Sequence, residues 1–405
     1  MSWKEVRFEE LYSEPSRNGI YKSKEHRGRG IKMVNMGELF ANDFIGEQEM
    51  ELIALSASEM SRNCLAEGDL LFGRRSLTEE GAGKTSIVNR LTSPTTFESS
   101  LIRARLDKSK VNPLFYFYYL KSPNGRGKIK SIVSGVNVKG IRGSDLKNVP
   151  MPFPEKGIQD RISDILSAYD DLIEINNRRI QLLEDAARQV YQEWFVRLRF
   201  PGHEQTPMHD GLPEGWERVK ASEIIDVLSG GTPKTNIAEY WDGDIPFFTP
   251  KDCGDTPFVL STEKSLTESG LKNCNSRLFD EDALFITARG TVGNLQLALV
   301  PMAMNQSCYA LSEKVGIGQF YLYCAMSAEM SHLKNQAVGA VFSAIIVKTF
   351  DQITLTRPDG RNVDKFNSVV NPIFGQIKTL ILQNQKLCQA RDLLLPRLMR
   401  GELIT

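Results

Sequence analysis

The stretch Trp3–Leu11, with the sequence WKEVRFEEL, returns roughly 200 residues later as Trp216–Ile224, with the sequence WERVKASEI. Two further pairs of stretches recur in the same order: Asp69–Phe72 (DLLF) with Asp282–Phe285 (DALF), and Phe115–Tyr118 (FYFY) with Phe320–Tyr323 (FYLY). An arginine follows closely after both DLLF and DALF. One such match could be chance, but several matches in a shared order predict an internal repeat. We therefore expect two related domains whose offsets drift because their loops differ in length.

A long helical pattern follows each of the two repeated regions. Apolar residues recur at steps of three and four over residues 158–194 and again over residues 366–398. Arg391 interrupts the second stripe, and Pro396 is expected to end or kink that helix because proline lacks a backbone N–H donor. Each half of the chain therefore consists of a globular region and a long amphipathic helix.

Each helical stripe carries an asparagine at a position that faces the seam. Asn176 and Asn384 each stand four residues after a leucine, Leu172 and Leu380 respectively. A buried amide is costly unless it is hydrogen bonded, and such residues fix the register and the number of partners in coiled coils. We therefore predict that the two helices pair within the chain through these four residues, as an antiparallel coiled coil. The alternative is that each helix packs only on its own domain and carries its asparagine at the edge.

The region before each helix mixes short β-branched and aromatic runs with many glycine and proline turns. Strands are expected at residues 31–35, 69–72, 86–88, 245–248 and 283–287, and short helices at residues 113–121 and 318–328. The predicted fold class is α+β, with two pseudo-repeated globular domains separated by the two long helices. Its expected parts are a first domain (1–154), a first long helix (155–200), a linker (201–212), a second domain (213–358) and a second long helix (359–405).

The composition is that of an ordinary globular protein, with 41% hydrophobic and 25% charged residues. The 50 basic and 50 acidic residues balance, which argues against a protein that coats nucleic acid indiscriminately, but not against a specific DNA-binding protein with a few basic loops. No apolar run is long enough to span a membrane, and the charged first residues do not fit a signal peptide, so we expect a cytoplasmic protein. The six cysteines are scattered without metal-ligand spacing, which favours reduced thiols and no metal site.

Residues 81–86, GAGKTS, look like the end of a phosphate-binding P-loop. The full motif requires a glycine five residues before Gly83, where this chain has Thr78. The apolar strand ahead of it leads into Arg74 and Arg75 instead of into a tight glycine turn. We therefore expect no nucleotide site here.

The segments nearest to a DNA adenine methyltransferase motif are Asn112–Phe115 and Asn371–Phe374. Both lie in helical patterns and lack the second proline of the Asn/Asp-Pro-Pro-aromatic loop that holds a flipped base. The four histidines form no ligand cluster, and no nucleophile–base pair or nuclease carboxylate cluster is evident. The sequence therefore favours recognition over catalysis. A divergent DNA adenine methyltransferase and a coiled-coil scaffold without DNA readout are the alternatives.

Five motifs in the second half of the chain follow one another at intervals typical of a known family. They are Leu228–Lys234 (LSGGTPK), Ile245–Asp252 (IPFFTPKD), Leu284–Gly293 (LFITARGTVG), Asn305–Ser307 (NQS) and Leu393–Leu403 (LLLPRLMRGEL). Together they resemble type I restriction-modification specificity subunits along nearly the whole chain. The first half matches more loosely, since Leu71–Ser76 stands where the Thr287–Gly293 pattern would be and no Gly-Gly-Thr-Pro occurs there. That difference is expected if each half reads a different sequence.

The resemblance implies a non-catalytic subunit with no cofactor of its own. Each half would be a target-recognition domain that reads a short half-site in double-stranded DNA. The two helices would serve as a spacer and as the dock for two methyltransferase (modification) subunits, which use S-adenosylmethionine to methylate adenine. Motor-nuclease (restriction) subunits would join them to cleave DNA with ATP and magnesium.

Candidate DNA contacts follow from what readout requires: arginine or lysine for guanine edges and phosphates, and asparagine or glutamine for adenine. In the first half they are Lys22, Lys24, Arg27, Arg29, Arg74, Arg75, Lys84 and Lys139, which lie in glycine-rich stretches expected to be exposed loops. In the second half they are Thr232, Lys234, Lys251, Arg289 and Gln306. Arg74, Arg75 and Arg289 are favoured because both repeats place arginine just beyond the same strand. For the others a solvated surface side chain is the alternative, and Thr232 with its two preceding glycines could mark only a turn.

Overall fold

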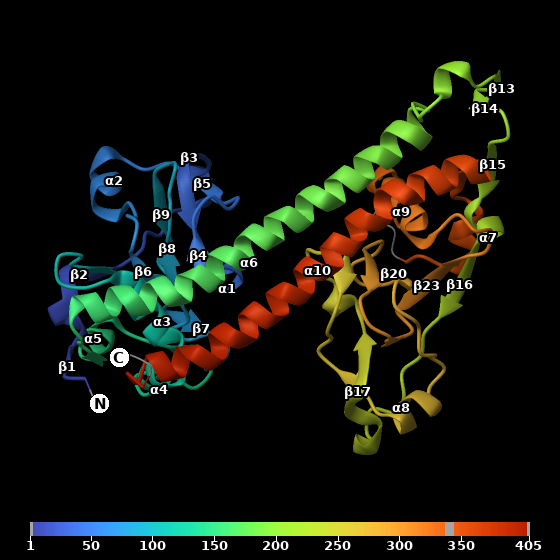
Figure 1. Ribbon diagram of the computed structural model, residues 1–405. Coiled ribbons are helices and arrows are strands. Elements are labelled where there is room, and N and C mark those ends of the chain that lie inside the picture. Colours follow the sequence, from blue (N-terminus) through green and yellow to red (C-terminus); the bar gives the residue numbers. More distant parts are fainter. Residues whose placement is uncertain (1–2, 337–343, 403–405) are drawn as a thin grey trace. The chain divides into compact units, whose positions relative to one another are not determined.

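Figure 1 shows a computed structural model of the chain, which describes residues 3–336 and 344–402. Leu403, the last residue of the closing motif, lies outside the described residues. The chain divides into two units: unit 1 comprises Met1–Leu172 and Leu387–Thr405, and unit 2 comprises Ile173–Lys386. Each of the two long helices, α6 (Lys156–Tyr191) and α10 (Gly360–Leu398), contributes one part to each unit.

Unit 1 is built on a five-stranded sheet with the order β2-β10-β6-β8-β4. Its strands are β2 (Tyr12–Asn18), β4 (Phe44–Ile45), β6 (Leu70–Gly73), β8 (Thr85–Val88) and β10 (Leu101–Leu106). Neighbouring strands run antiparallel, except that β4 runs parallel to β8. Every residue of β6 and β8 is buried, which explains why their sequences read as short apolar runs instead of alternating.

Smaller elements complete unit 1. A second sheet has the order β5-β3-β9, β1 pairs with β12, and β7 pairs with β11. The strands are β1 (Glu5–Arg7), β3 (Arg27–Val34), β5 (Glu51–Ile53), β7 (Arg75–Ser76), β9 (Thr95–Phe97), β11 (Lys139–Gly140) and β12 (Pro150–Pro152). The helices are α1 (Met36–Ala41), α2 (Ala57–Asn63), α3 (Pro113–Lys121), α4 (Pro123–Lys130) and α5 (Gly143–Leu146). Helix α3 buries all of its aromatic residues, as a helix in the middle of a core must.

Unit 2 repeats this architecture. Its sheets have the orders β16-β23-β20-β21-β18 and β19-β17-β22, and β15 pairs with β24. The strands are β15 (Glu217–Lys220), β16 (Ile225–Ser229), β17 (Trp241–Phe248), β18 (Phe258–Val259), β19 (Ser265–Leu266), β20 (Leu284–Thr287), β21 (Leu295–Ala298), β22 (Ala303–Met304), β23 (Cys308–Glu313) and β24 (Thr354–Arg357). The helices are α7 (Ala221–Ile224), α8 (Glu268–Lys272) and α9 (Gln319–Gln336), and a hairpin of β13 (Met208–His209) and β14 (Leu212–Pro213) precedes them.

The two units match in strand direction as well as in strand order. Strand β18 runs parallel to β21 as β4 does to β8, and β22 runs parallel to β17 as β9 does to β3. The backbone N–H of Ile141 donates to the carbonyl of Arg74, and that of Ile345 donates to the carbonyl of Ala288. The predicted α+β class, internal repeat and predicted strands are therefore confirmed.

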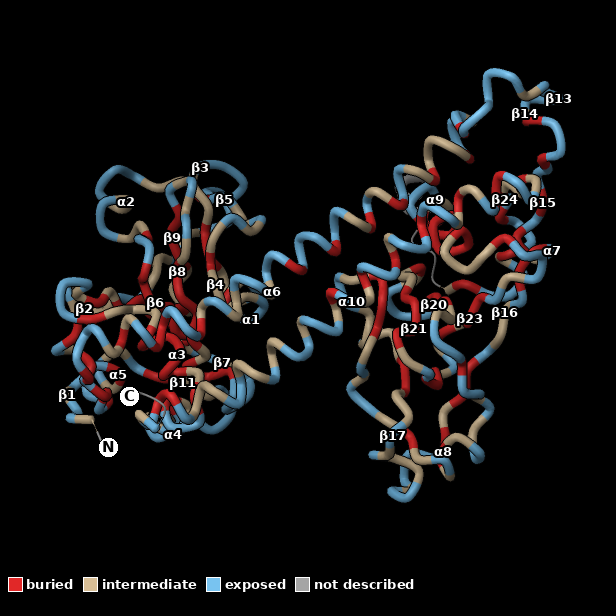
Figure 2. Tube along the Cα trace, viewed as in Figure 1, coloured by how far each residue is buried: buried red, intermediate tan, exposed pale blue. Residues whose placement is uncertain are grey.

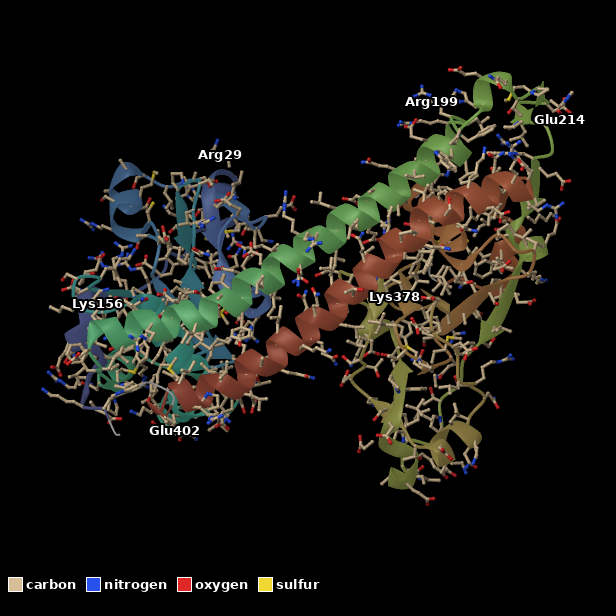
Figure 3. All side chains as sticks on the ribbon, viewed as in Figure 1. Arg29, Lys156, Arg199, Glu214, Lys378 and Glu402 are labelled. Atoms are coloured by element: carbon tan, nitrogen blue, oxygen red, sulfur yellow. The ribbon has the colours of Figure 1, made fainter. Side chains whose placement is uncertain are left out.

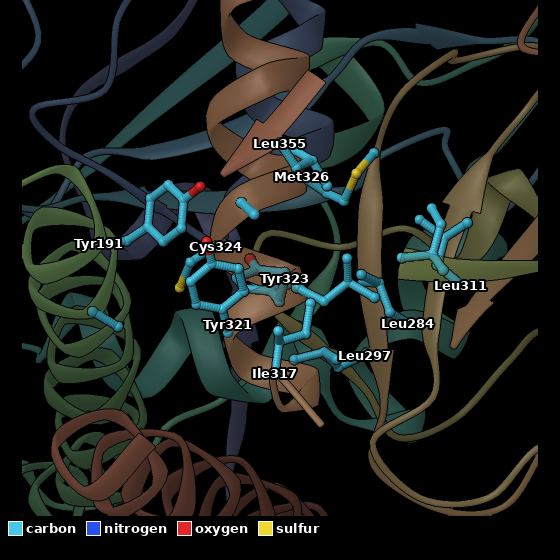
Figure 4. Close-up of a cluster of buried hydrophobic side chains, with 14 of the residues drawn as sticks. Tyr191, Leu284, Leu297, Leu311, Ile317, Tyr321, Tyr323, Cys324, Met326 and Leu355 are labelled. Atoms are coloured by element: carbon cyan, nitrogen blue, oxygen red, sulfur yellow. The ribbon is translucent and has the colours of Figure 1, made fainter. Parts of the chain in front are cut away.

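The core of unit 2 lies between α9, the main sheet and the parts of α6 and α10 that belong to this unit. Figure 4 shows Tyr321 and Tyr323 of α9 among Leu284, Leu297 and Leu311, which come from three neighbouring strands. Tyr191 of α6 completes this side of the cluster, with its ring centroid 5.3 Å from that of Tyr321. The end of the first long helix is therefore part of the hydrophobic core of the second repeat.

The two long helices pair antiparallel. Within unit 2, the Asn176 side-chain amide donates to Oδ1 of Asn384 at 2.9 Å, and the Tyr191 ring lies 6.3 Å from that of Phe366. As residue numbers rise along α6, those of the contacted residues in α10 fall. Asn384 also donates to Asn177, and Leu380 of α10 is buried. The predicted antiparallel pairing is confirmed, with Asn176 and Asn384 in direct contact, and the burial of Leu380 agrees with its predicted place in the seam.

Leu172 is not a seam residue, so that part of the prediction was wrong. Its side chain is 49% exposed, whereas Leu166 is buried and Asp170 has a side chain only 12% exposed. The buried face of α6 therefore steps from Ile162 to Leu166 and then to Asp170, which binds Arg391 of α10. Because a charged residue lies in the seam here, the pattern of apolar residues alone assigned the wrong face of α6 to the seam around Leu172. Figure 2 shows buried and exposed residues alternating along both helices.

The end of α10 is part of unit 1. Leu398 and Met399 are buried in the same cluster as Ile162 and Leu166 of α6 and Phe8 near the start of the chain. Pro396 stands in the last turn of α10, which ends at Leu398. The core of unit 1 is thus assembled from residues that lie far apart along the chain.

Candidate nucleic-acid interface

Four loops of unit 2 meet at one end of its sheets. The loop after β16 lies against the β22–β23 loop so closely that a Cβ at Gly230 would collide with the carbonyl oxygens of Met304 and Asn305. The Asn305 N–H donates to the carbonyl of Phe248 at the end of β17, and the Arg289 N–H donates to Ser307. This close approach is the physical reason for glycine in the GGTP motif, because only glycine lets the two backbones touch.

These loops bring four of the five candidate side chains of the second half together. The Thr232 hydroxyl donates to Oε1 of Gln306, while Arg289 and Lys251 stand on the neighbouring loops after β20 and β17. Both cations are exposed, and neither has a side-chain partner among the residues that the structure describes. Lys234 lies farther along the loop after β16, where its carbonyl accepts from the Trp241 indole at 3.3 Å. The cluster offers free donors on a surface made of loops, as DNA readout requires.

The corresponding end of unit 1 has the same backbone framework. The Arg74 N–H donates to Ser100 at 2.8 Å, as the Ala288 N–H donates to Ser307 at 2.8 Å, so Arg75 is the counterpart of Arg289. Arg75 is exposed and lies on β7, which pairs with β11 and so places Lys139 opposite Ser76. The predicted placement of arginine beyond the same strand in both repeats is confirmed. Arg74 itself is half-buried and donates to the Ser99 carbonyl.

The remaining candidates of unit 1 divide into paired and free cations. Lys22 lies 2.7 Å from Glu59, and its hydrogen bond together with those of Ser56 lowers the pKa of that carboxyl to about 2. Arg27 lies 2.7 Å from Glu51. Lys24 and Arg29 are exposed without a side-chain partner in the described part of the chain. Several of these residues do not lie in loops as predicted: Lys24 begins a short 3-10 helix (Lys24–His26), Arg27 and Arg29 belong to β3, Arg75 to β7 and Lys139 to β11.

The partly buried Lys84 side chain makes its contacts within unit 1. Its amine donates to the carbonyl of Phe40 near the end of α1 and lies 5.5 Å from the centre of the Phe40 ring. A cation at a helix C-terminus stabilises the unpaired carbonyls there. This placement gives Lys84 a structural contact that sequence reasoning did not anticipate.

The P-loop-like segment has no free amides to offer to a phosphate. The N–H groups of Ala82, Gly83 and Lys84 donate to the carbonyls of Thr78, Gly73 and Gly81, and that of Gly81 donates to the Thr78 hydroxyl. A P-loop works by pointing such amides at the nucleotide. The segment is therefore a closed turn between β7 and β8.

We expect that the chain shows no saturable ATP binding and that Lys84→Ala leaves this result unchanged. Equilibrium dialysis with radiolabelled ATP measures it directly. The variant should lower the thermal midpoint, because α1 loses its cation, and this shift verifies that the substitution acts where the structure places it. Saturable binding by the unmodified chain that disappears in Lys84→Ala would contradict the structural reading.

Sequence reasoning missed three exposed cations near these surfaces. Arg17 on β2 and Arg142 beside α5 are exposed in unit 1, and the exposed Lys264 of unit 2 lies 5.5 Å from the centre of the Trp241 ring. Nothing in the local sequence marks them, since pairing between distant strands determines where they lie.

The two segments that come nearest to a methyltransferase motif lie at the start of one helix and inside another. Asn112 is the N-cap of α3, where its Oδ1 accepts from the Leu114 N–H, and Asn371 lies inside α10. Over residues 3–336 and 344–402, no three histidine, cysteine, aspartate or glutamate side chains are grouped to hold a metal ion. All six cysteines are free thiols. No helix in the described ranges is long and apolar enough to cross a membrane.

Comparisons with known proteins agree with the repeat. Residues 2–185 and 213–381 match the family model for the type I restriction modification DNA specificity domain. The chain is 25% identical over 393 residues to the type I restriction enzyme MjaIX specificity subunit of Methanocaldococcus jannaschii, covering 94% of this chain and 89% of that protein. It is 20% identical over 437 residues to the HindI specificity subunit of Haemophilus influenzae, covering 92% and 94%. The solved S subunit of a type I restriction-modification system from M. genitalium has the same fold, with a TM-score of 0.55, 17% identity and coverage of 98% and 96%.

Proposed function

The chain belongs to the type I restriction modification DNA specificity family and is a non-catalytic DNA-recognition subunit, and from this premise we propose that each unit reads one half of a bipartite duplex target. The observation that carries the proposal is the repeated sheet in which an exposed arginine follows the equivalent strand of each unit, Arg75 after β6 and Arg289 after β20. Because the two sets of loops differ in sequence, the two half-sites should differ too. A scaffold without DNA readout and a methyltransferase are not favoured.

Within each unit we assign the contacts according to which side chains are free. Arg289, Lys251 and Gln306 of unit 2 can donate to base edges or phosphates, as can Arg75 and Lys139 of unit 1. Thr232 orients Gln306 through their hydrogen bond. Lys24, Arg29, Lys234 and Arg74 supply further donors nearby, whereas Lys22, Arg27 and Lys84 are committed to intramolecular partners.

Methyltransferase subunits are the proposed partners of the long helices, and restriction subunits would join the assembly through them. The outer face of α6 keeps large apolar side chains exposed at heptad spacing: Ile165 and Leu172 in unit 1, and Ile175 and Leu182 in unit 2. Exposed apolar stripes of this kind are typical of protein interfaces. The cofactors of the assembly, S-adenosylmethionine, ATP and magnesium, would belong to those partners.

Leu182→Asp is expected to weaken co-purification of the methyltransferase partner by about 10-fold or more. Burying a leucine side chain contributes about 1.5–3 kcal/mol, and a charge in its place forfeits that contribution. Gln181→Asp is the matched control, because it adds the same charge at an exposed neighbouring position that points away from the stripe. Equal retention of the partner by both variants would exclude this face as the dock.

Mapping modified adenines in DNA from cells that carry this chain with its methyltransferase partner tests the proposed function. We expect a single bipartite motif with two specified segments and an unspecified spacer between them. Methylation without a motif, or a continuous motif without a spacer, would contradict the proposal.

A further inference from the structure

Strand β3 of unit 1 contains a three-residue bulge. Arg27 and Ile31 both stand opposite Ile53 of β5, so Gly28, Arg29 and Gly30 have no partner on that strand. Gly28 and Gly30 have φ values of 86° and 106°, and a Cβ at Gly30 would collide with the Ile53 carbonyl. Glycine is therefore required on one side of Arg29 and favoured on the other. Figure 3 shows Arg29 at the outer end of unit 1, pointing away from its body.

The base of the bulge is closed by a salt bridge. Arg27 and Glu51 lie on opposite strands with Nη1 and Oε2 2.7 Å apart, and both side chains are about two-thirds buried, at 35% and 32% exposure. This salt bridge links the two strands at the base of the bulge and therefore restricts the motion of residues 28–30. Only Arg29 then projects from it, since its two neighbours have no side chains.

Unit 2 has the same bulge with different chemistry. Trp241 and Ile245 both stand opposite Leu266, which leaves residues 242–244 unpaired, and Asp242 has a φ of 60° where Gly28 has 86°. Lys264 over the Trp241 ring closes this bulge at the positions of Glu51 and Arg27. Two chemically different pairs of side chains, a salt bridge in unit 1 and a cation–π pair in unit 2, thus close the same kind of bulge. The bulge itself is the shared element of the repeat, whereas its tip and its closing pair differ between the units.

The charges around Arg29 differ from those of an ordinary phosphate-binding surface. Three neighbouring cations are neutralised in place, Lys22 by Glu59, Arg27 by Glu51, and Lys32 by Glu47 at 3.3 Å, which leaves Lys24 as the other exposed cation of this stretch. Phosphate binding draws on many free cations acting together. A single projecting guanidinium, with its planar fork of donors, instead matches the O6 and N7 acceptors of guanine in the major groove.

We propose that the bulge at residues 28–30 is a base-reading finger that places Arg29 on a guanine of the half-site read by unit 1, with Arg27 as its positioning residue. This inference rests on the proposed function. The tip of unit 2, Asp-Gly-Asp, carries no side-chain donor and cannot read guanine in this way. The two repeats therefore differ at this position in the kind of base edge they can accept.

The test uses the full chain assembled with its methyltransferase partners and a pool of duplex DNA randomised within the target. Sequencing the bound fraction gives the preference at each base pair. Arg29→Ala should reduce the preference for guanine at one position of one half-site by about 10- to 100-fold. Arg29→Lys should keep most of the overall affinity but still lose that preference, because lysine lacks the two-pronged fork. The double variant Asp242→Asn with Asp244→Asn is the control and should leave that half-site unchanged.

Arg27 is tested by rescue. Arg27→Ala should reduce the same guanine preference by less than Arg29→Ala does, since the finger loosens but its tip remains. Combining Arg27→Trp with Glu51→Lys borrows the closing pair of unit 2 and should restore the preference. If all Arg29 variants keep the wild-type motif and only bind every sequence more weakly, with a shallower salt dependence, Arg29 holds phosphate and the inference is overturned. A wild-type assembly without any sequence preference would instead refute the proposed function.

Discussion

Exchanging residues 1–154 for the corresponding domain of another specificity subunit is expected to change one half of the recognised target and to leave the other half unaltered. The reason is that each unit carries its own pair of sheets and its own set of loops with free donors. Losing a complete half-site from a specific target lowers affinity for the original sequence by several orders of magnitude, since each wrong base pair costs about 1–3 kcal/mol. Modified-adenine mapping in cells with the chimera measures both halves at once.

The structure indicates how such a chimera should be built. The junction belongs between β12 and the start of α6, but the incoming domain must also accept Leu398 and Met399, which fill the core of unit 1 from the other end of the chain. A second chimera that also takes residues 387–402 from the donor protein is therefore the folding control. Alteration of both half-sites in both chimeras would show that the units do not read independently.

Arg391→Ala is expected to destabilise unit 1 by about 3 kcal/mol, the low end of the cost of breaking a buried ion pair. Arg391 donates to Asp170, whose side chain is only 12% exposed, and the Tyr118 hydroxyl donates to the same carboxylate. Burial, reinforced by Asp170, raises the pKa of Tyr118, so its hydroxyl stays protonated as a donor. Without Arg391, the carboxylate remains buried with one neutral partner and no counter-charge.

Urea unfolding followed by circular dichroism measures this loss. Arg397→Ala is the control on the same helix, because its 3.9 Å ion pair with Glu402 is exposed and worth at most about 1 kcal/mol. In a double-mutant cycle, Asp170→Ala should reduce the cost of Arg391→Ala by removing the stranded charge. If the Arg391 and Arg397 variants lowered the free energy of unfolding equally, the buried pair would contribute no more to stability than the exposed pair does.

How far the sequence predicts this structure depends on whether a feature is local. The repeat and the central strands were predictable because buried strands leave short apolar runs, as Leu70–Phe72 does. The asparagine pairing was predictable because Asn176 and Asn384 stand at matching positions in two periodic stripes. Leu172 was misassigned because Asp170, a charged residue, occupies the seam, and its partner lies more than 200 residues away.

The candidate interface was predictable in unit 2 and only partly so in unit 1. Four of five residues in unit 2 meet because they follow strands of the same pair of sheets. In unit 1, the partners of Lys22, Arg27 and Lys84 are 44 residues away or less, as between Lys84 and Phe40, yet they lie on other elements. A sequence shows which residues carry charge but not which of them face each other across strands. The glycines around Arg29 suggested a loop, whereas the structure uses them to build a bulge inside a strand.

The sharing of the core of unit 1 between both ends of the chain has a consequence for biosynthesis. Phe8, Ile162 and Leu166 emerge from the ribosome long before Leu398 and Met399, which belong to the same hydrophobic cluster in the finished core. Unit 1 therefore cannot complete its core until the ribosome has synthesised unit 2 and the end of α10. Until then, part of the apolar surface of unit 1 stays exposed. Unit 2 draws all its residues from one continuous stretch and needs no such delay. A product that ends between residues 386 and 398 should therefore contain a complete second repeat and an incomplete first one, and we expect cellular proteases to cleave it in the first repeat.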